Sequence, residues 1–265
     1  MSEIARAERA FDSHTHLNHP RLLRKLAQVL SRAQAAGVRE MIVVGYDVAS
    51  SRVAVSLAQE QQGLWATVGV HPHDAASVDE ATLDELRTLA RSPRVVAIGE
   101  TGLDFYRDLS PRDAQEQSFG SHLALAAELN LPAVLHCRSA QDRFLAVLRE
   151  RSDASAPLIW HSFDGSLEQA QQAMALGAVL GFNGSITYPR SEQMRQVAAA
   201  LPIERVLLET DCPYLPPEPR RKGDNEPANL PLISRQLGDA RGVGTDDVLR
   251  ATTANARRVF RLPNN

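Results

Sequence analysis

The sequence has few cysteines and no strong excess of charge, and each of these absences narrows the class of protein. Only two cysteines occur in 265 residues, Cys137 and Cys212, and they do not form the spaced pattern of a secreted disulfide-rich domain. Reduced thiols and a cytoplasmic location are therefore expected. The formal net charge is −3 at pH 7, so overall charge gives no indication of a nucleic-acid-binding protein, although it leaves a local basic patch open.

Long apolar runs are also missing. No stretch approaches the roughly 20 apolar residues that a membrane-spanning helix needs, and MSEIARAERA at the start lacks the apolar run of a signal peptide. We therefore expect no membrane association. No linker, low-complexity tract or repeat divides the chain, which predicts an N-terminal extension (residues 1–10) and one domain (residues 11–265). Oligomeric state has no signal in the sequence, so a monomer is the default expectation.

Eight short apolar runs alternate with amphipathic stretches along the chain. The predicted strands cover residues 11–17, 38–46, 64–70, 94–103, 131–137, 157–162, 178–184 and 205–211. Clear helical patterns cover residues 21–37, 81–92, 112–130 and 191–202, and residues 245–262 are predicted to form a final helix. This alternation predicts an α/β protein with a single (β/α)8 barrel, on which the final helix packs. An open doubly wound sheet is the alternative, but no glycine-rich phosphate loop follows the first strand.

Side chains that bind metals occur at the ends of five predicted strands. In a (β/α)8 barrel the carboxyl ends of the strands meet at one mouth, where such proteins carry out their chemistry. A lone histidine or carboxylate after a strand is commonly a loop or capping residue, but five such strand ends together favour a shared site. Residues two apart on a strand also point to the same face, as in the first pair. The predicted ligands are His14, His16, Glu100, His136, His161 and Asp211.

Imidazole and carboxylate ligands suit divalent ions such as Zn, Mn, Mg, Co or Ni. Six ligands exceed the roughly three that an open zinc site uses, so two ions about 3.5–4 Å apart fit better. Glu100 is the predicted bridge between them, because its strand lies across the mouth from the first strand. Glu209, two residues before Asp211, is either an orienting partner of a ligand histidine or a buried carboxylate with other contacts.

Six blocks of the sequence resemble, in order, the signatures of the TatD-type metal-dependent deoxyribonucleases, and most closely those of the YcfH-type hydrolases. The blocks are DSHTHL, VGVHPHDA, IGETGLDFYR, LHCRSA, WHSFDGS and LLETDCPYL, and the resemblance runs from about Phe11 to Phe260. It implies an amidohydrolase-type barrel with one to three divalent ions. It also implies hydrolysis of phosphodiester bonds in DNA, typically as a 3′-to-5′ exonuclease acting on single strands or 3′ ends. Carried over by motif, the metal ligands are the same six residues.

The predicted chemistry is therefore phosphodiester hydrolysis with two-metal activation of water. We expect Asp211 to orient or deprotonate the water, and Glu100 and His161 to act with the ions on the reacting phosphate. Tyr106 could stack on an unpaired base. The predicted substrate contacts are His71, Arg138 and Arg221, whereas His19, His73 and His122 are assigned to loops and helix surface and both cysteines to the core.

Two alternatives remain open at the level of sequence. A small-molecule amidohydrolase or phosphoester hydrolase could use the same metal site, since such barrels also begin with His-x-His. Many of them bridge their metals with a modified lysine on the fourth strand, however, where this chain has Glu100. A metal-bound scaffold without activity is the second alternative, and the intact set of ligands argues against it.

Overall fold

The computed structural model describes residues 10–151 and 156–263. The predicted N-terminal extension lies outside the described residues except for Ala10, which already begins the first strand. Within the two described ranges, none of the helices combines the length and the apolar character needed to cross a membrane.

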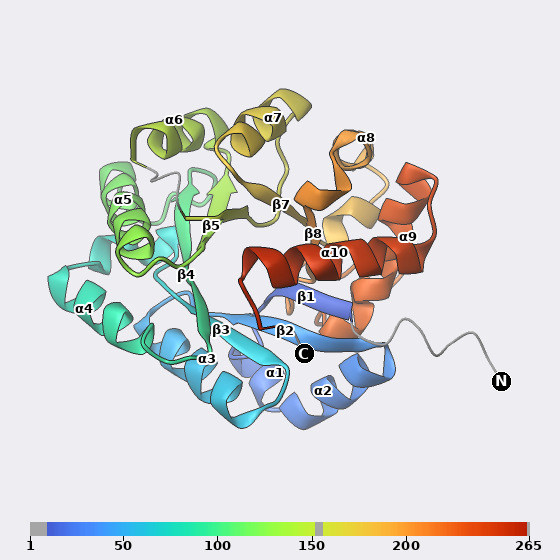
Figure 1. The fold of residues 1–265 in the computed structure, drawn as a ribbon, viewed down its shortest axis with the longest axis horizontal. Helices are drawn as coiled ribbons and strands as arrows, with labels where there is room; N and C mark the ends of the chain where they lie inside the picture. The colour runs from blue at the N-terminus through green and yellow to red at the C-terminus, as the bar shows by residue number, and fades with distance from the viewer. Residues whose placement is uncertain (1–9, 152–155, 264–265) are drawn as a thin grey trace.

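Eight parallel strands form one sheet in the order of the sequence, which confirms the predicted (β/α)8 barrel (Figure 1). The first and last strands close the barrel through backbone hydrogen bonds, from Asp211 N–H to the carbonyl of His14 (2.9 Å) and from His16 N–H to the carbonyl of Cys212 (2.8 Å). Candidate ligands thus lie on the segments that complete the ring. The strands are β1 (Ala10–Thr15), β2 (Val38–Val44), β3 (Leu64–Val68), β4 (Val95–Asp104), β5 (Ala133–Arg138), β6 (Leu158–Trp160), β7 (Val179–Phe182) and β8 (Val206–Leu208).

Helices surround the strands (Figure 1). Their buried apolar residues belong to the same core cluster as those of the strands. The α-helices are α1 (Pro20–Leu23), α2 (Leu26–Ala35), α3 (Val48–Glu60), α4 (Glu80–Leu89), α5 (Arg112–Glu128), α6 (Gln141–Arg151), α7 (Leu167–Ala175), α8 (Glu192–Ala200), α9 (Leu230–Arg241) and α10 (Thr245–Val259). Short 3-10 helices are η2 (Pro72–Ser77), η3 (Gly184–Thr187), η4 (Ile203–Arg205) and η5 (Pro227–Asn229). The predicted single helix over residues 21–37 was wrong, because Lys25 takes a non-helical backbone conformation and separates α1 from α2.

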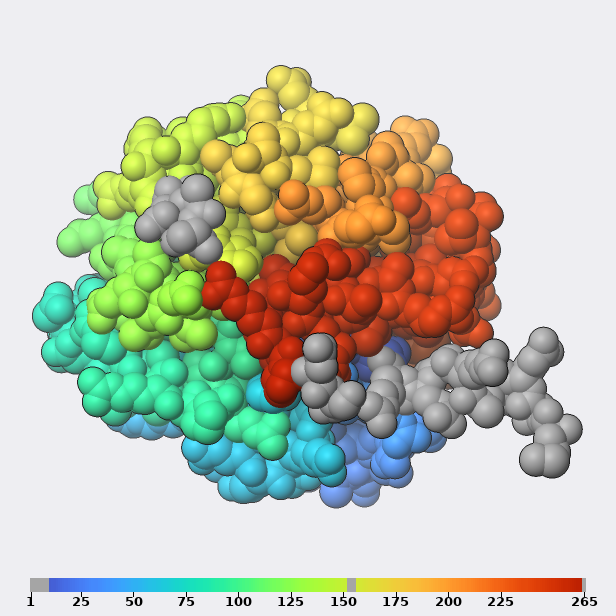
Figure 2. Space-filling model, viewed as in Figure 1, coloured from blue at the N-terminus to red at the C-terminus, as the bar shows by residue number. Residues whose placement is uncertain are grey.

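The predicted C-terminal helix is α10, which crosses the barrel at the amino ends of the strands (Figure 1). Thr253 accepts a hydrogen bond from the backbone N–H of Phe11 at 3.1 Å, and the rings of Phe11 and Phe260 stack. Apolar residues from the barrel interior and from α10 form one continuous cluster at this end. In the space-filling view the end of the chain covers the centre of this face (Figure 2). Because this apolar cluster fills the amino end of the barrel, a reaction site is expected at the carboxyl ends of the strands.

Candidate metal centre

The structure brings the six predicted ligands together at the carboxyl ends of the strands. His14 and His16 lie at the end of β1, and Glu100 and His136 lie on β4 and β5. The other two are His161, which directly follows β6, and Asp211, which lies shortly after β8. One detail of the prediction was wrong: Glu100 does not end its strand, because β4 continues to Asp104.

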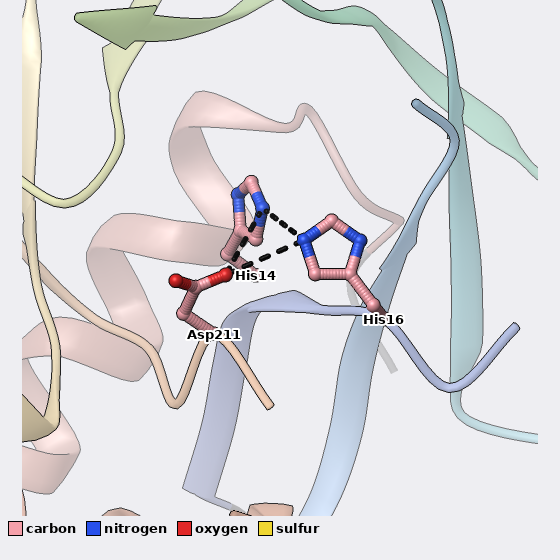
Figure 3. Close-up of side chains that lie close together, drawn as sticks. All are labelled: His14, His16 and Asp211. Atoms are coloured by element: carbon pink, nitrogen blue, oxygen red, sulfur yellow. Dashed lines mark hydrogen bonds and ion pairs between the residues drawn. The ribbon is translucent and has the colours of Figure 1, made fainter. Parts of the chain in front are cut away.

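One group of potential ligands consists of His14, His16 and Asp211, whose side chains point toward one another (Figure 3). Nε2 of His16 lies 3.3 Å from Nε2 of His14 and 3.3 Å from Oδ1 of Asp211. The other ring nitrogen of His16 faces the carbonyl of Val44 at 3.4 Å. A proton donated to that carbonyl leaves Nε2 with the free lone pair that a metal requires.

Two further groups share Glu100, which lies at the middle of the cluster. Its Oε2 lies 3.4 Å from Nε2 of His14, and its Oε1 lies 2.9 Å from both Nε2 of His161 and Nδ1 of His136. Nε2 of His71 is 3.6 Å from the same Oε1. The structure therefore places His71, predicted as a substrate contact, among the potential metal ligands.

The ionised form of the Glu100 carboxyl group is strongly favoured by its surroundings. Burial alone would raise the pKa of the carboxyl group, but His161, His71 and His14, together with the hydrogen bond to His136, hold that pKa well below its ordinary range. Conversely, burial alone would lower the pKa of His161, but the charge of Glu100 raises it well above its ordinary value. Positive charge is therefore attracted to the centre of the cluster.

The donor set fits divalent ions better than it fits protons. Imidazole nitrogens face each other at 3.3 Å in two pairs, His14 with His16 and His136 with His161. When neither nitrogen of such a pair carries a proton, their facing lone pairs repel each other, and a cation between them removes the conflict. Within the described residues, no lysine or arginine forms an ion pair with Glu100 or Asp211. Nδ1 of His14 is buried without a hydrogen-bond partner.

Carboxylates behind the cluster lie next to two of the histidines. Oε1 of Glu209 lies 3.5 Å from Nδ1 of His161, and it also accepts a hydrogen bond from the backbone N–H of Ser162 at 2.6 Å. Glu209 thus has a contact of each predicted kind, because the 3.5 Å distance to His161 suits an orienting partner and the bond from Ser162 is one of the other contacts of a buried carboxylate. On the other side, Oδ2 of Asp104 lies 3.3 Å from Nε2 of His136 and 2.9 Å from Nε2 of His73.

Asp104 and His73 were missed as parts of the site, and His73 had been assigned to a loop surface. A signal was present in the sequence, because Asp104 is four residues after Glu100 and therefore on the same face of a strand that continues that far. The assignment of His122 was also wrong. His122 is fully buried, and its Nε2 accepts a hydrogen bond from the backbone N–H of Val70 at 3.0 Å.

The predicted substrate arginines lie outside the ligand cluster. Arg138, the last residue of β5, places its guanidinium over the ring of Tyr106, with Cζ 4.0 Å from the ring centroid. Arg221 lies in the same way over Tyr188, at 3.7 Å. Both cysteines are buried, as predicted.

A barrel with buried histidines and carboxylates at the carboxyl ends of its strands defines the class of metal-dependent hydrolases. The family model described as TatD related DNase matches residues 11–261, and this chain belongs to that family. Family membership makes the protein a metal-dependent hydrolase that acts on ester bonds, of the kind that includes nucleases.

Relatives that match along almost their whole length support this assignment. The 3′-5′ ssDNA/RNA exonuclease TatD of Klebsiella pneumoniae is 42% identical over 260 residues, which cover 96% of this chain and 99% of the relative. The uncharacterized metal-dependent hydrolase YabD of Bacillus subtilis is 36% identical over 252 residues, which cover 95% and 99% of the two chains. The crystal structure of the TatD homolog YJJV from Escherichia coli K12 superposes with a TM-score of 0.91 at 31% identity, covering 97% of this chain and 100% of that one.

Proposed function

We propose that the protein is a two-metal exonuclease that removes nucleotides from the 3′ end of single-stranded DNA. The observation that carries the proposal is the shared use of ligands, because His14 belongs to two of the donor groups and Glu100 also belongs to two. Such sharing suits two neighbouring ions rather than one. The related exonuclease of Klebsiella pneumoniae supports the choice of substrate and direction.

In this proposal His14, His16 and Asp211 would hold one ion, His136 and His161 would hold the other, and Glu100 would be available to both. When bound, the ions would supply water of lowered pKa and positive charge opposite the phosphodiester. His71 would hold either an ion or a phosphate oxygen, since it lies within the same cluster.

Asp211 is proposed to orient the attacking water and accept its proton. Its backbone takes a left-handed conformation with φ of 56°, which only a minority of residues other than glycine adopt. The hydrogen bond from its N–H to the carbonyl of His14 and the one from Tyr214 N–H to its own carbonyl hold this conformation. The carboxylate is thereby fixed against His16 rather than free in a loop. Positioning of this kind is what a general base requires.

The experiment is digestion of single-stranded DNA labelled at the 5′ end by metal-loaded protein, beside a panel of carboxylic esters, amides and small phosphodiesters. A ladder that shortens from the 3′ end is the expected result. Asp211→Asn is the matched variant, because asparagine tolerates the left-handed conformation but cannot accept a proton as a carboxylate does. We expect it to lose activity by about 10²–10⁴-fold, while its thermal stability in chelator, where no ion contributes, stays that of the unaltered protein. Rapid turnover of esters or amides with intact DNA would overturn the proposal.

A further inference from the structure

Three tyrosines near the mouth of the barrel each carry an arginine on one face of the ring. Arg138 lies over Tyr106, Arg221 over Tyr188, and Arg21 over Tyr214, the last with Cζ 5.3 Å from the ring centroid. Such a pair combines an aromatic surface for a base with a cation for a phosphate.

Two of the pairs lie on opposite sides of the candidate metal centre. Tyr106 comes two residues after Asp104, the last residue of β4, and Arg138 ends β5. Tyr214 follows β8, and the centroid of its ring lies 5.8 Å from that of His16, which directly follows β1. Because the eight strands run around the barrel in sequence order, the β4–β5 edge faces the β8–β1 edge across the mouth. A strand whose phosphate lies on the metal centre therefore meets one pair on each side.

The two sides differ in how available their cations are. The side chain of Arg138 makes no hydrogen bond or ion pair within the described residues, apart from its contact with the ring. Asp224, in contrast, accepts hydrogen bonds from Arg21 at 3.1 Å and from Lys25 at 3.0 Å. A carboxylate in that position competes with phosphate for the arginine. On each side of the mouth the tyrosine is accessible to a substrate, since Tyr106 is 63% exposed and Tyr214 is 44% exposed.

This asymmetry matches the asymmetry of a strand that is cleaved at its 3′ end. The terminal nucleotide has no phosphate other than the one under attack, so its subsite needs an aromatic or apolar surface and no further cation. The nucleotide before it has a second phosphate on its 5′ side, so its subsite needs a cation that is free to bind.

We propose that Tyr106 and Arg138 form the subsite for the second nucleotide from the 3′ end, with its base on Tyr106 and its 5′ phosphate on Arg138. Tyr214 packs against the terminal nucleoside on the other side of the metal centre. This inference rests on the proposed exonuclease function and assigns the orientation of the strand across the mouth.

The test compares two single-stranded oligonucleotides, one with normal phosphates and one with a neutral methylphosphonate at the 5′ phosphate of the second nucleotide. We expect Arg138→Gln to raise KM for the normal strand about tenfold, with a smaller effect on kcat. A tenfold change is what the loss of one charge-assisted hydrogen bond to the substrate would produce. On the methylphosphonate strand the variant and the unaltered protein should have the same KM. Arg138→Lys should recover part of the loss, because it restores the charge.

Arg94→Gln is the matched control, since Arg94 also lies over an aromatic ring, that of Trp65, at 4.8 Å, but precedes β4 at the amino end of the barrel. It should leave KM unaltered. The inference is overturned if Arg138→Gln behaves like Arg94→Gln, or if its defect persists on the methylphosphonate strand. Failure of the proposed function gives a different result: the unaltered protein would hydrolyse bis(p-nitrophenyl) phosphate and leave both oligonucleotides intact.

Discussion

Asp104 binds His136 on the side of the ring that points away from the candidate metal centre, with Oδ2 3.3 Å from Nε2. The same oxygen also forms a hydrogen bond with Nε2 of His73. Oδ1 accepts hydrogen bonds from the backbone N–H groups of Tyr106 and Arg107 at 3.0 and 2.8 Å. A carboxylate that accepts from Nε2 fixes the proton there, so that Nδ1 is left with a lone pair facing Glu100. Asp104 is therefore a positioning residue for a proposed ligand.

Replacing Asp104 by asparagine should weaken metal binding by about 10–100-fold. An amide N–H in place of Oδ2 would face the N–H of His136, which favours the tautomer whose Nδ1 carries the proton and cannot bind a metal. Calorimetric titration of metal-free protein with Mn or Zn measures the affinity. Asp108→Asn is the control, since Asp108 pairs with Arg112 at the surface. Equal affinities for the two variants would contradict the proposed role of Asp104.

Removing the metal should lower the thermal stability of the protein as well as its activity. An ion that binds only the native state stabilises it by about 2.7 kcal/mol at a free concentration 100 times Kd. We expect a higher Tm in saturating metal than in chelator. The double substitution of His14 and His16 by alanine removes two ligands of the group that also contains Asp211, so the difference in Tm should shrink markedly. An undiminished difference would show that the stabilising ion binds elsewhere.

Gly181 allows Glu209 to lie directly against β7. A Cβ at position 181 would lie only 2.8 Å from Cδ of Glu209. Gly181→Ala should therefore push this carboxylate away from His161 and reduce activity by about 10²-fold, the effect of a small misplacement of a catalytic group. Thermal unfolding measured on the same preparation separates this loss from misfolding. Full activity in a folded variant would mean that Glu209 does not position His161.

His122 should make the protein less stable as the pH falls from 6.5 to 4. Burial lowers its pKa from 6.5 to about 4, although the hydrogen bond to the carbonyl of Ser118 opposes this. Between these two pH values the unfolded chain binds a proton at His122 that the native state does not. The free energy of unfolding therefore decreases as the pH falls. The full effect is about 3 kcal/mol.

Chemical denaturation at a series of pH values, with and without His122→Gln, measures this contribution. The glutamine can still accept the hydrogen bond from Val70 but does not titrate, so its stability should fall less steeply between pH 6.5 and 4. The other histidines titrate in both proteins and cancel in the comparison. Parallel curves would contradict the assignment.

The barrel and its six potential ligands could be predicted because each depends on local pattern and on a simple rule of topology. His14, Glu100 and the other four residues all lie in or just after the carboxyl-terminal half of a predicted strand, and the carboxyl ends of barrel strands must meet. No knowledge of long-range contacts was needed. The predicted strand over residues 94–103 agrees with β4 to within one residue at each end, but Glu100 was taken as its closing residue although the strand continues to Asp104.

Contacts between distant segments account for what the sequence could not predict. His122 is polar and lies in a helix, but its acceptor role depends on the N–H of Val70, 52 residues earlier. The contact of Arg138 with Tyr106 likewise depends on the register between β4 and β5, in which Arg138 pairs with Asp104. The position of His71 among the ligands depends on the path of the chain after β3. Such distances are set by the packing of the whole barrel and not by either segment alone.

The helix α10 has a consequence for how a nucleic-acid strand could be processed. It covers the amino end of the barrel, and apolar side chains from α10 and the strands fill the axis behind it. A polymer therefore cannot thread through the molecule in the way that it passes through a ring-shaped nuclease. In the proposed exonuclease reaction, the released nucleotide and the shortened strand would leave by the end at which the substrate arrived. Release of the mononucleotide would then precede the next cycle, and we expect competitive inhibition by mononucleotide product to limit the rate on long strands.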